Sequence, residues 1–154
     1  MLARELIGNG GAAIATDLLG AKKALRCRAT GASMRPFLPC GSVLRIEPDP
    51  IPGLGDIVLL KAQGQRLLVH RVVRARRTDG EGVQFLTRGD SATQVDGWTP
   101  AEMVYGRVTR VEYGRMVARA DALLWRAAGL VWNHLAYRLR RLRSRVTGRL
   151  RRTQ

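Results

Sequence analysis

The sequence has 154 residues, of which 45% are hydrophobic, so it is long enough for one domain with a hydrophobic core and short for two. The net charge is +15 and is uneven, because residues 121–154 hold nine arginines and one aspartate. Two cysteines exclude a disulfide scaffold and fit no metal motif, so we expect Cys27 and Cys40 to be buried free thiols, although pairing between them stays open. No run approaches the roughly 20 apolar residues of a spanning helix, and we expect no secretory signal.

The first part of the chain predicts short helices followed by strands. Residues 2–7 and 12–19 have helical composition and are separated by glycines. Residues 24–30 and 43–47 show the alternation of β-strands. The stretch GASMRPFLPCGS between these strands places Ser33 on a turn.

The middle of the chain predicts a hairpin and further strands. Residues 56–62 (DIVLLKA) and 66–76 (RLLVHRVVRAR) have buried-strand patterns and are separated by Gly64, which favours a hairpin. Residues 89–100 predict a polar loop. Further strand patterns lie at residues 83–88, at 103–113 and near Met116. Short strands with regular turns are typical of an all-β barrel or sandwich.

The tail has a different pattern. Apolar residues recur at steps of three and four from Leu124 to Leu150, which predicts one amphipathic helix over residues 121–154 beside a domain of residues 1–120. We expect its arginines to meet an anionic membrane surface, with nucleic acid as the less favoured partner. The chain would then be peripheral to a membrane or cytoplasmic. A solvated helix face, or a stripe packed on the β domain, is the plainer alternative.

Ser33 and His70 are the candidates for catalysis. A serine needs a base to become a nucleophile at neutral pH, and His70 is the plausible one, because His134 is expected on the surface of the tail helix. The imidazole in turn needs an acceptor, which either Asp90 or Asp96 offers. The alternative is a turn serine with a local backbone bond and an ordinary core histidine.

Five blocks carry a resemblance to a known family. In order, GASMRPFL, GDIVLL, LVHRVV, FLTRGD and VYGRV resemble the type I signal peptidases and their LexA-like relatives. The match is closest to the endoplasmic-reticulum and archaeal type, which pairs its serine with a histidine rather than a lysine. The resemblance implies a mainly β, coiled LexA/signal peptidase-like domain with an extended substrate groove. It also implies that Ser33 is the nucleophile, His70 the general base, Asp96 the triad aspartate and Asp90 a supporting residue.

The activity implied is that of a serine endopeptidase that cleaves an extended leader or signal segment, with no cofactor and no metal. Gly31 and Ala32 stand where the family commonly has Ser-Gly, so we expect oxyanion stabilisation from backbone N–H groups such as that of Ser33. The family's N-terminal membrane anchor is not expected here. Two other classes remain: a LexA-like self-cleaving or nucleic-acid-binding regulator, and a catalytically silent peptide-binding module. The segment before the first strand is short for a helix-turn-helix domain.

Overall fold

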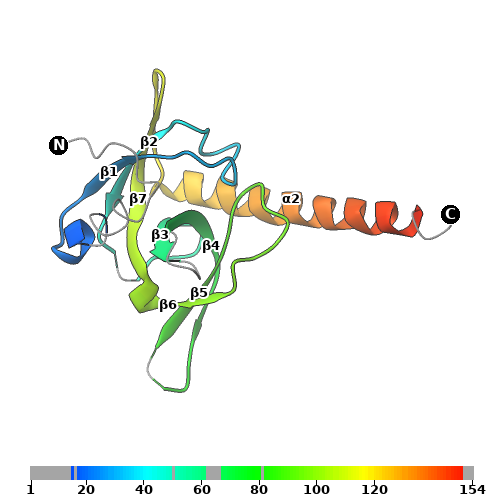
Figure 1. Ribbon diagram of the computed structural model, residues 1–154, viewed down its shortest axis with the longest axis horizontal. Helices are drawn as coiled ribbons and strands as arrows, with labels where there is room; N and C mark the ends of the chain where they lie inside the picture. The colour runs from blue at the N-terminus through cyan, green and yellow to red at the C-terminus, as the bar shows by residue number, and fades with distance from the viewer. Residues whose placement is uncertain (1–14, 16, 50, 62–66, 81, 151–154) are drawn as a thin grey trace.

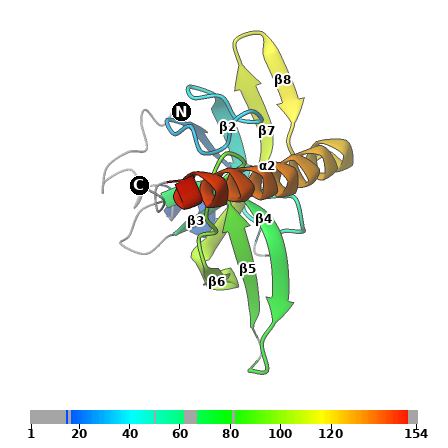
Figure 2. The ribbon, with the colours of Figure 1, turned by 90° about the vertical axis from the view of Figure 1, so that its right-hand side faces the viewer.

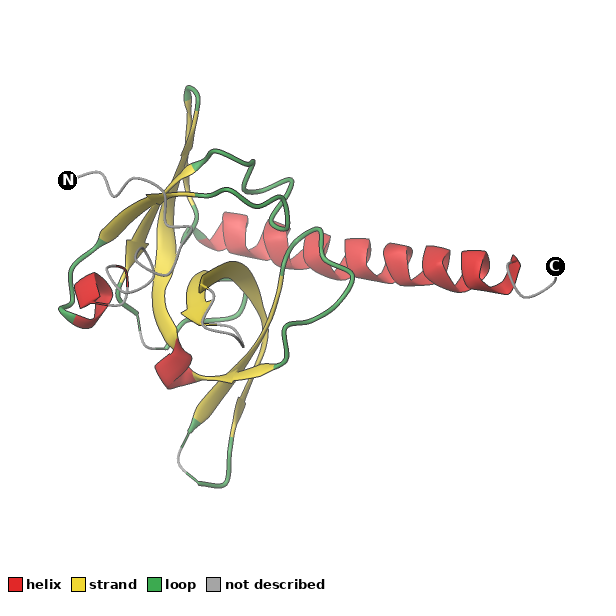
Figure 3. Cartoon of the chain, viewed as in Figure 1, coloured by secondary structure: helices red, strands yellow, loops and turns green. Residues whose placement is uncertain are grey.

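The computed structural model describes residues 15, 17–49, 51–61, 67–80 and 82–150 (Figure 1). Their strands form one antiparallel sheet that curls on itself. A long C-terminal helix begins beside this sheet and extends beyond it (Figure 3). The mainly β architecture with a C-terminal helix is therefore confirmed, as a single curled sheet rather than two packed ones.

The described residues contain eight strands, which range from three residues in β6 to eleven in β4. In chain order they are β1 (Leu25–Arg28), β2 (Val43–Glu47), β3 (Ile57–Lys61), β4 (Leu67–Arg77), β5 (Val83–Arg88), β6 (Trp98–Pro100), β7 (Val104–Tyr113) and β8 (Met116–Arg119). The order across the sheet is β1-β2-β7-β3-β4-β5-β6, and β8 pairs with β7. The hairpins β4–β5 and β7–β8 project on opposite sides of the molecule (Figure 2).

Most strands lie where the sequence predicts them. The expected hairpin is β3 paired with β4, in a register that sets Val58 opposite His70. The polar loop predicted over residues 89–100 is wrong at its end, because Trp98–Pro100 forms β6 against β5 and a 3₁₀ helix, η1 (Ala101–Met103), follows. An aromatic and a β-branched residue at the loop's end suit a pleated strand, although the polar composition before them hides it.

The predicted N-terminal helices fall largely outside the described residues. Residues 17–20 are helical, which agrees with the end of the second predicted helix. The first predicted helix, over residues 2–7, lies outside the described residues.

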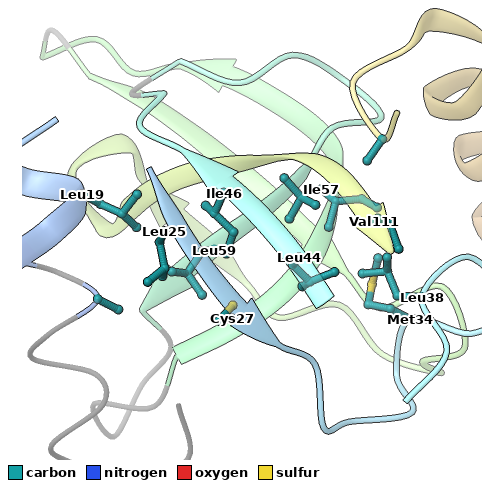
Figure 4. Packing of buried hydrophobic residues seen from close by; sticks show 13 residues of the cluster. Leu19, Leu25, Cys27, Met34, Leu38, Leu44, Ile46, Ile57, Leu59 and Val111 are labelled. Carbon is teal, nitrogen blue, oxygen red and sulfur yellow. The ribbon is translucent and has the colours of Figure 1, made fainter. Parts of the chain in front are cut away.

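The hydrophobic core holds the turn that carries Ser33. β1 alternates buried and exposed side chains, whereas β3 is buried on both faces. The main cluster includes side chains of β1, β2, β3 and β7 together with Met34 and Leu38 from the Ser33 turn (Figure 4). Those two residues are 4% and 1% exposed, so they fix the turn to the core directly after Ser33. A second cluster, Val58, Leu60, Val72, Phe85 and Val104, fills the other face of β3.

The tail forms one helix, α2 (Leu123–Leu150), which runs through Gly129 without a break. Its face toward the β domain contains the buried residues Gly129, Asn133 and Ala136, whereas Leu124, Val131, Leu135 and Leu139 of the predicted apolar stripe are exposed. The alternative in which the stripe packs on the β domain is therefore wrong. No helix among the described residues combines the length and the apolar character needed to cross a membrane.

The cysteines differ in their surroundings. Both are free, and Cys27 is buried in the core as expected. The expectation of a buried thiol is wrong for Cys40, which is exposed and whose Sγ lies 3.1 Å from the carbonyl oxygen of Thr30. Burial raises the pKa of the Cys27 thiol to about 11.

Candidate active site

The structure brings Ser33, His70 and Asp96 into one hydrogen-bonded chain. His70 Nε2 lies 3.0 Å from Ser33 Oγ, and His70 Nδ1 lies 2.6 Å from Asp96 Oδ2. The carboxylate accepts a hydrogen bond from Nδ1–H, so the Nε2 lone pair faces the serine hydroxyl. The side chains of His70 and Asp96 are 9% and 17% exposed, so both are largely shielded from bulk water, and Asp96 is the more accessible of the two.

Each member comes from a different element. Ser33 lies on the turn after β1, whose ends are joined by hydrogen bonds between Ala29 and both Gly41 and Ser42. His70 lies within β4, where it pairs with Val58 of β3, and the next residue, Arg71, also pairs with Arg88 of β5. Asp96 lies in the loop between β5 and β6.

Thr87 holds that loop against β5. Its hydroxyl donates to Asp96 Oδ2 at 2.7 Å, and its carbonyl accepts the backbone N–H of Asp96 at 3.0 Å. The carboxylate therefore receives a second hydrogen bond, which fixes its orientation toward His70.

Gly89 allows the segment after β5 to pass directly behind the serine and the histidine. A Cβ at this position would lie 2.6 Å from the carbonyl oxygen of Ser33 and 3.1 Å from His70 Nε2. The next residues hold the turn from the same side, because Ser91 donates its backbone N–H to Ser33 O at 2.8 Å and its hydroxyl to Ala32 O at 2.9 Å. The distance from Ser33 to His70 thus depends on the segment from Gly89 to Ser91.

Asp90 does not join the triad but supports it. Its carboxylate receives a bidentate pair from Arg71 at 2.7 and 2.8 Å, and both side chains are fully buried. Asn133 of α2 donates its side-chain amide to Asp90 Oδ1 at 2.9 Å. Since Arg71 follows His70 and Asp90 follows Gly89, this buried pair joins β4 beside His70 to the segment that contacts Ser33.

The helix α2 closes this polar layer. Arg88 donates to the side-chain oxygen of Asn133 at 2.6 Å and stacks on the ring of Tyr137, and Arg140 donates to the carbonyl of Asp90 at 3.3 Å. Burial lowers the pKa of the Arg88 guanidinium from its ordinary value. A Cβ at Gly129 would lie 2.2 Å from the Arg71 guanidinium, so only glycine permits this close approach. The inner face of α2 therefore supplies acceptors and space to buried arginines.

The backbone N–H of Ser33 lies beside the candidate nucleophilic oxygen, Ser33 Oγ. Within the described residues the N–H of Ser33 has no hydrogen-bond partner. It belongs to the same residue as the attacking oxygen, which is the position of a donor that stabilises a developing oxyanion. Neither the Gly31 nor the Ala32 side chain offers a donor, and the expectation of oxyanion stabilisation by backbone N–H groups stays a prediction.

The structure describes no alternative site for metal chemistry. Among the described residues, no three His, Cys, Asp or Glu side chains come close enough together to hold a metal ion. His134 is exposed on α2, as expected, and lies 2.9 Å from the carbonyl of Leu130 through its Nδ1.

Several residues that support the candidate site are not predicted from the sequence. Thr87 is a strand residue like many others, and its role depends on a loop that returns nine residues later. Asn133 is a polar residue within the apolar pattern of the tail and is therefore visible in the sequence, but the sequence does not indicate that it contacts Asp90, 43 residues away.

Comparison of the chain with protein-family models and with curated proteins finds no match.

Proposed function

We propose that the protein is a serine endopeptidase of the signal peptidase type, with a LexA/signal peptidase-like fold. The observation that carries the proposal is the chain from Ser33 Oγ through His70 to Asp96, at 3.0 and 2.6 Å. A serine, a base and an orienting carboxylate in this order are the parts that acyl transfer needs. The curled sheet and the five ordered blocks are consistent with the same family.

In the proposed mechanism, His70 Nε2 takes the hydroxyl proton as Ser33 Oγ attacks the carbonyl carbon of the scissile peptide bond. The Ser33 N–H donates to the oxyanion of the tetrahedral intermediate. The imidazolium, stabilised by Asp96, returns its proton to the leaving amine as the C–N bond breaks. Water then attacks the acyl-serine with His70 as base, which releases the acid product and restores the hydroxyl.

The proposed substrate is a leader or signal segment bound in extended form, with small side chains beside the scissile bond, as the family resemblance implies. Cleavage of a partner protein, rather than of the chain itself, distinguishes this function from that of a LexA-like regulator. A silent binding module would bind such segments and leave them intact.

The test is incubation with a panel of leader peptides, read by mass spectrometry. The wild-type protein should cleave at least one peptide at a defined bond, and Ser33→Ala should leave all of them intact. Thr78→Ala is the matched control, because it also removes one side-chain hydroxyl, which donates to the carbonyl of Gly82 in the exposed turn between β4 and β5, outside the site. Cleavage by Ser33→Ala at the wild-type rate would exclude the proposed nucleophile.

A further inference from the structure

The outward face of α2 carries an apolar stripe that no part of the described chain covers. We define the stripe as Leu124, Val131, Leu135 and Leu139, whose exposed fractions lie between 54% and 84%. Trp132, at the margin of the stripe, is 43% exposed. The opposite face of the same helix is buried against the β domain at Gly129, Asn133 and Ala136. The helix is thus held in place by one face and presents a large apolar surface with the other.

Basic side chains accompany the stripe. Arg138 and Arg141 are exposed on the same two turns as Leu135 and Leu139. The sequence keeps the three- and four-residue spacing at Leu142, Val146 and Leu150 and adds further arginines, and after Asp121 it contains no acidic residue. An apolar face bordered by arginines and aromatic rings suits the boundary between lipid headgroups and acyl chains.

The position of α2 leaves this face accessible. The helix extends well past the β domain toward the C-terminus, and the hairpins β4–β5 and β7–β8 point away from it (Figures 1 and 2). The C-terminal part of the helix therefore lies beyond the sheet.

The charge decides among the occupants of the stripe. A second copy of the chain would bring together two helices of the same strong positive charge, which oppose each other. Nucleic acid would satisfy the arginines and leave the leucines in water. An anionic lipid surface satisfies both, because phosphates meet the guanidinium groups while the apolar side chains enter the acyl region.

We infer that the protein binds the surface of an anionic membrane through the outward face of α2, lying flat with the stripe inserted. The inner face of the same helix contacts Asp90 and Arg88, so the binding would hold the Ser33 site at a fixed height above the lipid. The binding itself requires no peptidase activity, and its test is independent of the proposed function.

The experiment is co-sedimentation of the full chain with vesicles of phosphatidylcholine alone or mixed with phosphatidylglycerol. The wild-type protein should pellet with the mixed vesicles and not with the neutral ones, and added salt should weaken the binding. Leu135→Gln with Leu139→Gln should raise the lipid concentration for half binding at least about tenfold, since two side chains no longer insert. Glutamine retains helix propensity, and thermal unfolding of each variant checks that it folds.

The matched control is Met116→Gln with Val117→Gln, which removes two exposed apolar side chains of β8, on the hairpin that points away from α2, and leaves the net charge unchanged. This variant should pellet like the wild type. Recovery of the wild-type protein in the supernatant with anionic vesicles would overturn the inference. Pelleting of the Leu135→Gln/Leu139→Gln variant like the wild type would also overturn it and assign the arginines to a phosphate-binding partner such as nucleic acid. A dimer in sedimentation velocity that this variant abolishes, without vesicle binding, would assign the stripe to a second copy.

Discussion

Asp90→Asn should destabilise the protein strongly, because it leaves a buried arginine without its counter-charge. Both oxygens of Asp90 accept from Arg71, at 2.7 and 2.8 Å, and both side chains are fully buried. The new amide would keep one acceptor and set its NH₂ group against donors of Arg71 or Asn133. Breaking a buried pair in this way typically costs about 3–5 kcal/mol, which for a chain of this size lowers Tm by about 6–20 °C.

Thermal unfolding followed by circular dichroism measures the effect. Asp121→Asn is the matched control, since it breaks an Arg–Asp pair that lies at the surface, where Arg119 is highly exposed. Its Tm should stay close to that of the wild type. At temperatures below its Tm, Asp90→Asn should also have a lower peptidase activity than the wild type, because the segment from Gly89 to Ser91 positions Ser33. A Tm of Asp90→Asn equal to that of the control would refute the role of the buried pair.

Further predictions concern the triad and the thiols. Asp96→Asn should lower kcat by about ten thousandfold and leave Tm nearly unchanged, because it removes the charge that orients the imidazole; a stable variant with wild-type kcat would exclude Asp96 from the triad. The kcat/KM of the wild type should fall on acidification, because the base of the proposed mechanism must be unprotonated to accept the serine proton, and a flat profile would exclude His70 as the base. Iodoacetamide should modify Cys40 in the folded protein and Cys27 only after unfolding, as intact mass will show, because the raised pKa and burial of Cys27 leave almost no accessible thiolate. Rapid labelling of both cysteines would contradict this.

The strands were predictable because their signal is local. Residues 43–47 and 83–88 are short stretches with apolar and β-branched residues between turns, and both form strands with those bounds. β6 was missed because its three residues follow a polar loop, and pairing with β5 rather than its own pattern makes it a strand.

The candidate site was predictable in part. The residues alone left Asp90 and Asp96 as equal acceptors, and the family resemblance favoured Asp96. The two carboxylates differ in their surroundings. Asp96 faces His70 and Thr87 at the edge of the sheet, whereas Asp90 faces Arg71 in the interior. Such long-range contacts leave no trace in local spacing.

The docking of α2 runs against the usual expectation that an apolar stripe packs on the core. The surface beneath the helix contains the guanidinium groups of Arg71 and Arg88, which need acceptors and room. Asn133 supplies an acceptor and Gly129 supplies room, so the polar and small face of α2 turns inward. Helical periodicity locates two faces but does not tell which one a polar partner surface will bind.

Acylation of Ser33 is the step on which the proposed function depends, and a p-nitrophenyl ester of a short acyl peptide tests for it. Such an ester acylates faster than the acyl-enzyme hydrolyses, so the adduct accumulates and acid quenching preserves it for peptide mapping by mass spectrometry. We predict one acyl group on Ser33 of the wild-type protein, and no adduct on the same peptide of Ser33→Ala. An acyl group on another residue, with Ser33 unmodified while the ester is turned over, would contradict the account.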